Sequence, residues 1–310
     1  MTPLIPPFDV AMVRVGPWTV TAFGPLVSLG FLTGTWLAAR KANRDGLDGN
    51  WIHRFAVRVA IAIVVGGHLG NALYEPGLFW HQPVELLRLH HGLSSMGGFC
   101  GAVLGLLWFL RGERRAGRPV ANDVRWRYLD ALIYGFSAGW CLGRLGCFLT
   151  HDHIGTATTF WLGVRGVCAH AEGNPAVACH DLGLYEALLS GLVLFPAFIW
   201  LDRRGHRPGT IVACWCLVYG ATRLYLDDLR LDPRWLSLTP AQHGSVVLIA
   251  IGIWIGRMRR RRGPDAQTAA GRVNATAALR KRRLQPAAVA LIAGNASLTG
   301  AAGGMPPIAF

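Results

Sequence analysis

The chain has 310 residues, of which 52% are hydrophobic and only 15% charged, and its mean hydropathy is +0.33. A soluble protein carries about 25% charged residues, so the composition excludes an ordinary soluble enzyme and predicts a polytopic helical membrane protein. The net charge of +14 also suits nucleic-acid binding. The arginines, however, gather in short loops between apolar runs, as in membrane proteins, and we expect no nucleic-acid partner.

Seven apolar runs have roughly the 16–24 residues that a bilayer crossing requires. They cover about 18–39, 58–74, 93–110, 128–149, 184–201, 210–226 and 242–256. Eighteen lysines and arginines fall in or beside the loops of one side, against five on the other. The sequence therefore predicts an all-α fold of seven transmembrane helices, with the N-terminus outside and the C-terminus in the cytoplasm.

The chain changes character near its end. Residues 1–262 hold all seven runs and form one predicted transmembrane domain. Residues 263–310 are rich in alanine and glycine and carry a basic cluster at 280–283. We expect a disordered cytoplasmic tail there, because this segment offers little apolar surface to bury. The first ten residues lack the basic start and compact apolar core of a cleaved signal peptide, so none is expected.

The stretch GRLGCFLTHDHIG, residues 143–155, places an arginine inside the fourth run. A charge at membrane depth is unfavourable by roughly 2.5–3.5 kcal/mol on insertion scales and commonly marks a functional site. Arg144 is therefore either a clamp for phosphate oxygens or half of a structural ion pair. Gly135, Gly139 and Gly143 recur every four residues just before it, a spacing that lets another helix approach closely.

Two further charged positions lie near the outer ends of their runs. Arg223 has Asp227 one helical turn later, on the same face. The pair is either a second phosphate clamp oriented by a carboxylate or a self-contained interfacial ion pair. Glu186 begins the fifth run, where it either complements the helix dipole or faces an arginine inside the bundle.

Histidines supply the candidates for proton transfer. His151, Asp152 and His153 follow the fourth run and form either a general base or a solvated loop. With Cys147 they also give the metal-ligand spacing C-x3-H-x-H, but no second ligand pair accompanies it and we expect no metal. His68 interrupts the second run and either lines a cavity or bonds to a neighbouring helix.

Two outer segments carry further candidates. Cys168 and Cys179 lie in the longest outer loop, where oxidising conditions allow a disulfide; two free thiols are the alternative. Ser94 is a candidate donor to a lipid headgroup. Gly97, Gly98 and Gly101 beside it permit either a re-entrant turn or close helix packing.

Six stretches match, in order, the pattern of one known family. They are PFDVAMVRVGPWTVTAFG (7–24), HGLSSMGG (91–98), GRLGCFLTHDHIG (143–155), LYEALLSGLVLF (184–195), YGATRLYLDDLR (219–230) and LTPAQHGS (238–245). On these motifs the chain resembles the phosphatidylglycerol–prolipoprotein diacylglyceryl transferases over residues 7–255. The third stretch is similar to the family's G-R-x-G-N-F-x-N-x-E-x-x-G and the fifth to its Y-G-x-x-R-F-x-x-E-x-x-R.

Arg144, Gly155, Glu186 and Arg223 match the family pattern. Other positions depart from it, namely Phe23 for a tyrosine, Met96 for the second histidine of HGGLSFHGG, Cys147 and Thr150 for asparagines, and Asp152 and Asp227 for glutamates. The resemblance implies a transferase of the bacterial plasma (inner) membrane. Such an enzyme moves diacylglyceryl from phosphatidylglycerol to the lipobox cysteine in the signal peptide of a preprolipoprotein, without a cofactor.

Applied to this chain, the reaction needs cations for the leaving phosphate, supplied by Arg144 and Arg223, and a base for the thiol, supplied by His151 or His153 with Asp152. Two other classes remain open. Met96 and Cys147 favour a repurposed paralogue that binds or transfers lipid without alkylating a thiol. The triplet His151, Asp152 and His153 favours a non-enzymatic membrane component with a histidine-lined site for a metal or haem.

Overall fold

A computed structural model describes residues 3–10, 12–16, 18–74, 94–168, 174, 176–230 and 234–261. The chain divides into two compact units, 1–257 and 258–310, and the second is described only where it completes the last helix. The expected tail at 263–310 therefore lies outside the described residues, as does His91 of the second motif.

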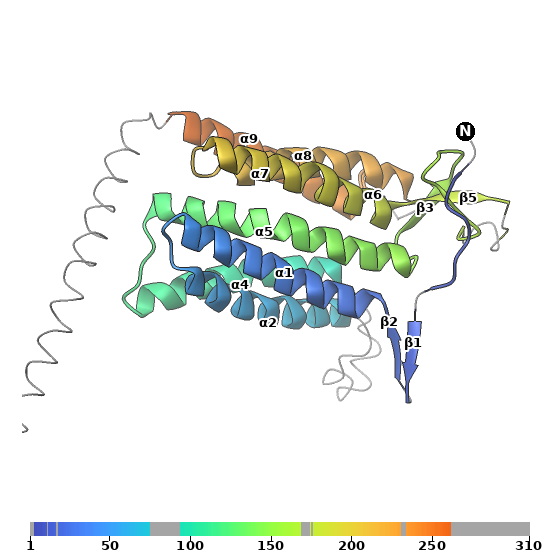
Figure 1. Cartoon of the computed structure of the whole chain (residues 1–310), viewed down its shortest axis with the longest axis horizontal. Coiled ribbons are helices and arrows are strands. Elements are labelled where there is room, and N and C mark those ends of the chain that lie inside the picture. Colours follow the sequence, from blue (N-terminus) through green and yellow to red (C-terminus); the bar gives the residue numbers. More distant parts are fainter. Residues whose placement is uncertain are drawn as a thin grey trace, which may run out of the picture. The chain divides into compact units, whose positions relative to one another are not determined.

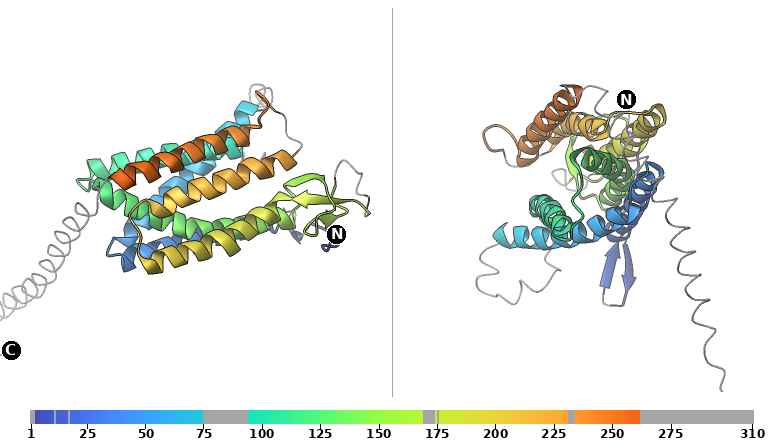
Figure 2. Two further views of the ribbon diagram at one scale, coloured as in Figure 1. Left: turned by 90° about the horizontal axis from the view of Figure 1, so that it is seen from above. Right: turned by 90° about the vertical axis from the view of Figure 1, so that its left-hand side faces the viewer.

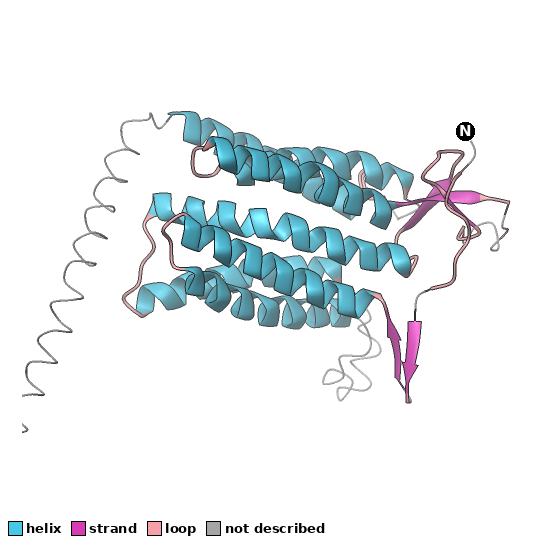
Figure 3. Ribbon diagram, viewed as in Figure 1, coloured by secondary structure: helices cyan, strands magenta, loops and turns pink. Residues whose placement is uncertain are grey.

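Helices occupy all seven apolar ranges (Figures 1 and 3). They are α1 (Phe23–Arg44), α2 (Gly49–Tyr74), α4 (Ser95–Arg115), α5 (Asn122–Leu149), a continuous rod of α6 (Leu182–Leu188), the π-helix η4 (Leu189–Leu194) and α7 (Phe195–Arg204), then α8 (Thr210–Leu226) with the 3₁₀ turn η5 (Asp227–Leu229), and α9 (Pro240–Arg261). Among the described residues, four helices are long and apolar enough to cross a membrane, at Gly49–Leu73, Asn122–Leu149, Leu182–Arg204 and Pro240–Arg260. The helical membrane class is confirmed, whereas the number of crossings and their orientation stay predictions.

The expected start of the first helix at residue 18 is wrong. Trp18–Thr21 forms strand β2, which pairs antiparallel with β1 (Met12–Val15), and the helix begins only at Phe23. Valine and threonine dominate the hairpin and favour extended backbone, and Gly16 turns between the strands at a φ of +59°. A purely α prediction misses this hairpin because its apolar residues continue directly into the helix.

A second small sheet was also missed by the all-α prediction. Its strands lie in the order β3 (Ile154–Ala157), β5 (Ala178–Asp181) and β4 (Val164–Arg165), all antiparallel. Cys179 of β5 is joined to Cys168 by a disulfide, which confirms that alternative over two free thiols. The sheet follows α5 and leads directly into α6, so it connects two helices that carry candidate site residues.

Glycines bring the helices into backbone contact. A Cβ on Gly135 or Gly139 of α5 would overlap with carbonyl oxygens of Gly34 and Gly30 on α1. At Gly143 it would meet only Val27, at 3.9 Å. The four-residue spacing therefore marks a helix contact at two of its three positions.

Glycines also bring α2 and α4 into backbone contact. Gly97 and Gly101 of α4 lie against Gly66 of α2, so the prediction of helix packing is confirmed and that of a re-entrant turn is wrong. Ser94 is the N-cap of α4, and its hydroxyl accepts a hydrogen bond from the backbone of Gly97 at 3.3 Å.

The helix α5 lies between α1 on one side and α6, α7 and α8 on the other, as the end-on view in Figure 2 shows. It packs against α6 and α8, which carry Glu186 and Arg223, and itself carries Arg144 in its last turns. The central position of α5 thus decides where the candidate site forms.

Candidate functional site

The carboxylate of Glu186 on α6 is the centre of a buried charge cluster. Its side chain is 1% exposed, and Nε of Arg144 lies 2.9 Å from its Oε2. Nη1 of Arg223, from α8, donates to its Oε1. The hydroxyl of Tyr219 and the indole N–H of Trp140 donate to Oε2 at 2.7 and 3.3 Å. Three helices therefore meet at one anion, and both candidate phosphate-binding arginines contact it.

The second carboxylate of the cluster is Asp227, at the end of α8. Its Oδ1 lies 3.1 Å from Nη2 of Arg223, which confirms the predicted pair, and its Oδ2 accepts a hydrogen bond from the hydroxyl of Thr239. Two guanidinium groups and two carboxylates balance one another in charge, as groups buried away from water must. A guanidinium has five N–H donors, so each arginine holding a carboxylate keeps donors for a further anion.

Helical spacing explains the local arrangement. Trp140 and Tyr219 each lie four residues before an arginine, so each aromatic ring shares a helix face with a guanidinium. The guanidinium carbon of Arg144 lies 4.6 Å from the ring centroid of Trp140. Sequence reasoning missed both aromatic residues, although their i, i+4 relation to Arg144 and Arg223 was visible.

A turn at His151 separates the side chains of the predicted group His151, Asp152 and His153. His151 has a φ of +53°, which reverses the chain between α5 and β3. Its Nε2 lies 3.0 Å from the carbonyl oxygen of Phe8, its ring packs on the ring of Phe8 with centroids 4.4 Å apart, and its Nδ1 lies 3.9 Å from Oδ2 of Asp181. His153 instead places Nδ1 3.1 Å from Oδ2 of Asp152. The two histidines thus have different partners.

The two aspartates beside these histidines differ in electrostatic environment. The neighbouring His153 is the main cause that holds the pKa of Asp152 below its usual value, and Arg144 acts in the same direction. Burial raises the pKa of Asp181 to about 7, against the effect of its hydrogen bonds from the backbone of α6. Asp152 is therefore an anion at neutral pH, whereas Asp181 titrates near neutrality.

Three supporting candidates lie at different places. Gly155 belongs to β3, where a Cβ would come within 2.6 Å of the carbonyl oxygen of Leu229, so a side chain is excluded. Ser94 caps α4, and His68 is buried on α2. The charge cluster is formed by α5, α6 and α8, whereas Ser94 and His68 lie on α4 and α2, and their supporting role stays a prediction.

A potential metal-ligand group exists beside the charge cluster. Ligand atoms of Cys147, Asp152 and His153 lie within 4.8 Å of one another, in the part of the chain that the structure describes. Its membership differs from the sequence pattern, because Asp152 takes the place of His151. Nη1 of Arg144 donates to Sγ of Cys147 over 3.8 Å, so this group adjoins the charge cluster.

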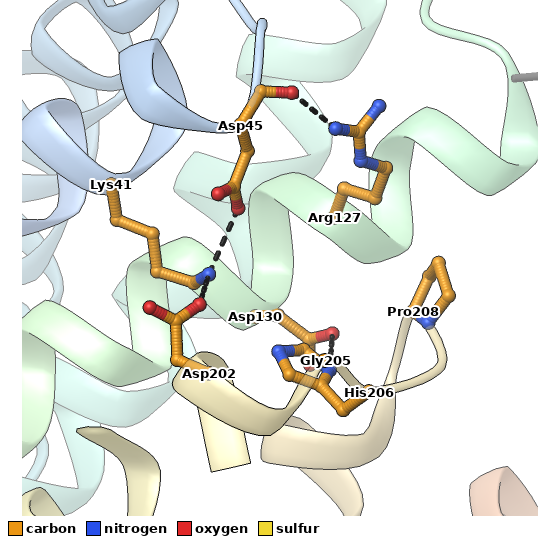
Figure 4. Close-up of a pocket in the computed structure, with 8 residues that line it drawn as sticks. All are labelled: Lys41, Asp45, Arg127, Asp130, Asp202, Gly205, His206 and Pro208. Atoms are coloured by element: carbon orange, nitrogen blue, oxygen red, sulfur yellow. Dashed lines mark hydrogen bonds and ion pairs between the residues drawn. The ribbon is translucent and has the colours of Figure 1, made fainter. Parts of the chain in front are cut away.

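A second polar group lines a cavity of about 210 Å³ at the opposite ends of α1 and α5 (Figure 4). Nζ of Lys41 lies 2.8 Å from Oδ2 of Asp45 and also contacts Asp202. The buried carboxylate of Asp130 accepts backbone hydrogen bonds from Gly209 at 2.6 Å and Val212 at 3.0 Å and so caps the start of α8. These contacts join the helix ends, and we assign them a structural role.

Comparison with known proteins gives a consistent result. Residues 10–257 match the family model described as prolipoprotein diacylglyceryl transferase. The chain is similar to proteins named phosphatidylglycerol–prolipoprotein diacylglyceryl transferase. The one from Solidesulfovibrio magneticus is 30% identical over 84% of this chain and 97% of the relative. Those from Thermus thermophilus and Phenylobacterium zucineum are 32% and 28% identical over 73% and 84% of this chain, and over 86% and 96% of the relatives.

The match covers β1, β2, all the helices of the first unit, and every residue of the charge cluster. It agrees with the family that the six sequence motifs indicate. This chain belongs to the prolipoprotein diacylglyceryl transferase family.

Proposed function

We propose that the protein transfers diacylglyceryl from phosphatidylglycerol to the lipobox cysteine thiol in the signal peptide of a preprolipoprotein. The observation that carries the proposal is the meeting of Arg144 and Arg223, from two helices, at the single carboxylate of Glu186. In a chain of this family, such a pair supplies the cations that a phosphate leaving group requires.

The proposed role of the arginines is to bind the lipid phosphate. Arg144 lies five residues before the end of α5 and Arg223 three before the end of α8, so both are near helix ends that lead to the sheet and η5. A planar guanidinium binds phosphate oxygens through two parallel N–H donors, which lysine cannot do. Glu186 has its oxygens occupied by arginine and tyrosine donors, so we assign it to orienting the guanidinium groups rather than to proton transfer.

The proposed base is His153. Asp152 lies 3.1 Å from its Nδ1, a relation that orients an imidazole and stabilises its protonated form. The substrate thiol gives its proton to this imidazole, and its sulfur attacks the glycerol carbon. The bond from that carbon to the phosphate oxygen breaks, so a thioether forms and glycerol-1-phosphate leaves. His151 fits less well as the base, because its Nε2 is already engaged by the backbone carbonyl oxygen of Phe8.

The proposed placement is a multi-pass protein of the bacterial plasma (inner) membrane, with seven crossings. The helices α1, α4 and α7 each carry two basic residues in their last turn, and these ends lie at the same end of the bundle in Figure 1. Positive residues favour the cytoplasmic side, so the sheet end faces outward. Reporter fusions after Arg115 and Arg204 test this placement: cytoplasmic signals support it, and a periplasmic signal at either point contradicts it.

A second candidate is a paralogue that binds phosphatidylglycerol but alkylates no thiol. Cys147 favours it, because its thiol, where the family pattern has an amide, accepts a hydrogen bond from Arg144 at 3.8 Å. Complementation of a bacterium depleted of its own transferase separates the two. Growth and lipid-modified prolipoprotein support the transferase, whereas a membrane-inserted but non-complementing chain supports the paralogue.

A further inference from the structure

We propose that Cys147, Asp152 and His153 form a binding site for a divalent transition-metal ion with the chemistry of Zn²⁺, at the junction of α5 and β3. Ligand atoms of these three residues lie within 4.8 Å of one another. A tetrahedral zinc ion, with bonds of about 2.0–2.3 Å, holds its ligands roughly 3.5 Å apart.

The backbone already holds the three residues together. Cys147 is in the last turn of α5, and its carbonyl oxygen accepts a hydrogen bond from the backbone N–H of Asp152 at 3.1 Å. The carbonyl oxygen of His153 accepts one from Leu182 at 3.0 Å, at the start of α6. The positive φ of His151 makes the reversal between them. The ligands therefore lie on backbone fixed from two sides.

The donor set selects the kind of ion. A thiolate and an imidazole favour zinc and its neighbours in the first transition series over calcium or magnesium, which prefer oxygen ligands alone. With the thiolate and the carboxylate both anionic, a divalent ion gives a complex of no net charge. Arg144 contacts the sulfur of Cys147, but Glu186 already balances its charge, so the ion meets no uncompensated cation.

The geometry also excludes a residue that the sequence pattern includes. In C-x3-H-x-H, His151 is a ligand together with His153. In the structure, Nε2 of His151 lies 3.0 Å from the carbonyl oxygen of Phe8 and its Nδ1 faces Asp181 at 3.9 Å, whereas Nδ1 of His153 lies 3.1 Å from Oδ2 of Asp152, which is itself a proposed ligand. The two histidines thus form a matched pair for testing the site.

An ion bound here occupies the imidazole of His153 that the proposed transfer uses as its base, so metal binding and proton transfer by His153 exclude each other. The test is therefore binding of Co²⁺ and Zn²⁺ to the purified full-length protein, and it does not depend on transferase activity. Cobalt should give a thiolate-to-metal absorption band in the wild type, and Zn²⁺ should remove it by competition. In Cys147→Ser the band should be absent. In His153→Asn the zinc affinity should fall by more than about 100-fold, since the loss of a direct ligand exceeds that of an outer-shell partner.

The controls are His151→Asn, which keeps a residue that tolerates positive φ, and Cys216→Ser, which changes another buried thiol. Both should bind zinc within about twofold of the wild type, because neither belongs to the site. Equal loss in His151→Asn and His153→Asn overturns the proposal. So does a cobalt band that survives in Cys147→Ser, because the bound ion is then held elsewhere.

Discussion

Nε of Arg144 lies 2.9 Å from Oε2 of Glu186, so a cation from α5 and an anion from α6 neutralise each other inside the helix bundle. The same carboxylate holds Arg223 from α8. The two carboxylate oxygens of Glu186 therefore hold the two guanidinium groups, one each, and set the spacing between them. This relation makes Glu186 the residue on which both the stability and the proposed phosphate site depend.

Glu186→Gln tests that dependence. The glutamine keeps the size and the hydrogen-bonding oxygen of glutamate but leaves two buried guanidinium groups with Asp227 alone. Removing one partner of a buried ion pair costs about 3–5 kcal/mol, so we expect a clear fall in the thermal midpoint of the detergent-solubilised protein. The control is Asp228→Asn, which breaks an exposed ion pair with Arg234 and should cost less than about 1 kcal/mol. Equal midpoints in the two variants contradict the central role of Glu186.

Arg144→Lys and Arg223→Lys test bidentate phosphate binding. Lysine keeps the charge but loses the planar fork, so each variant should bind phosphatidylglycerol vesicles almost as weakly as the alanine variant at the same position. We expect a loss of about 2–4 kcal/mol, or roughly 30- to 1000-fold in affinity. The exposed Arg165→Lys is the matched control and should bind normally. If the lysine variants bind like the wild type, the arginines are general countercharges.

Gly139→Ala should disrupt the contact between α1 and α5, because its Cβ would overlap with the backbone carbonyl oxygen of Gly30. Gly143→Ala, one turn later on the same helix, meets only Val27 at 3.9 Å and should be neutral. We expect Gly139→Ala to lower stability by about 1–3 kcal/mol, as overpacking does. Thermal unfolding of both variants measures the difference, and two equal midpoints would show that the helices are further apart than described.

Asp181 should make stability depend on pH. Burial raises its pKa in the folded protein to about 7, above the unfolded value of about 3.9. Between these two values the folded protein binds a proton that the unfolded chain lacks. The free energy of unfolding therefore falls as pH rises from about 4 to 7.

Asp181→Asn should flatten that part of the profile, since an amide still accepts the N-cap hydrogen bond from Leu184 but does not titrate. Thermal midpoints measured from pH 4 to 8 compare the two proteins. A variant profile parallel to that of the wild type would show that Asp181 is ionised throughout this range.

The seven helical ranges were predictable from the sequence because apolar runs of bilayer length leave little alternative to a helix. The strands were not. Trp18–Thr21 continues into an apolar run without a polar break, and only its pairing with Met12–Val15 distinguishes it from helix. The strands that follow Ile154 are short and pair across residues distant in sequence, so no local pattern reveals them.

The site was predictable where its contacts follow helical spacing. The pair Arg223–Asp227 is one turn apart and was found. The meeting of both arginines at Glu186 joins three helices. From the sequence, a contact between Glu186 and an arginine was only one of two alternatives, the other being interaction with the helix dipole. The partners of His151 were not predictable, because Phe8 lies 143 residues earlier in the chain and Asp181 thirty residues later.

The central claim is tested most directly by mass spectrometry of a synthetic lipobox peptide incubated with purified protein and phosphatidylglycerol vesicles. The account predicts that the peptide gains a diacylglyceryl group on its cysteine sulfur and that glycerol-1-phosphate appears in equal amount. With Arg144→Lys the rate should fall at least about 30-fold. A wild-type protein that binds the vesicles but leaves the peptide unmodified would contradict the transferase and favour the lipid-binding paralogue.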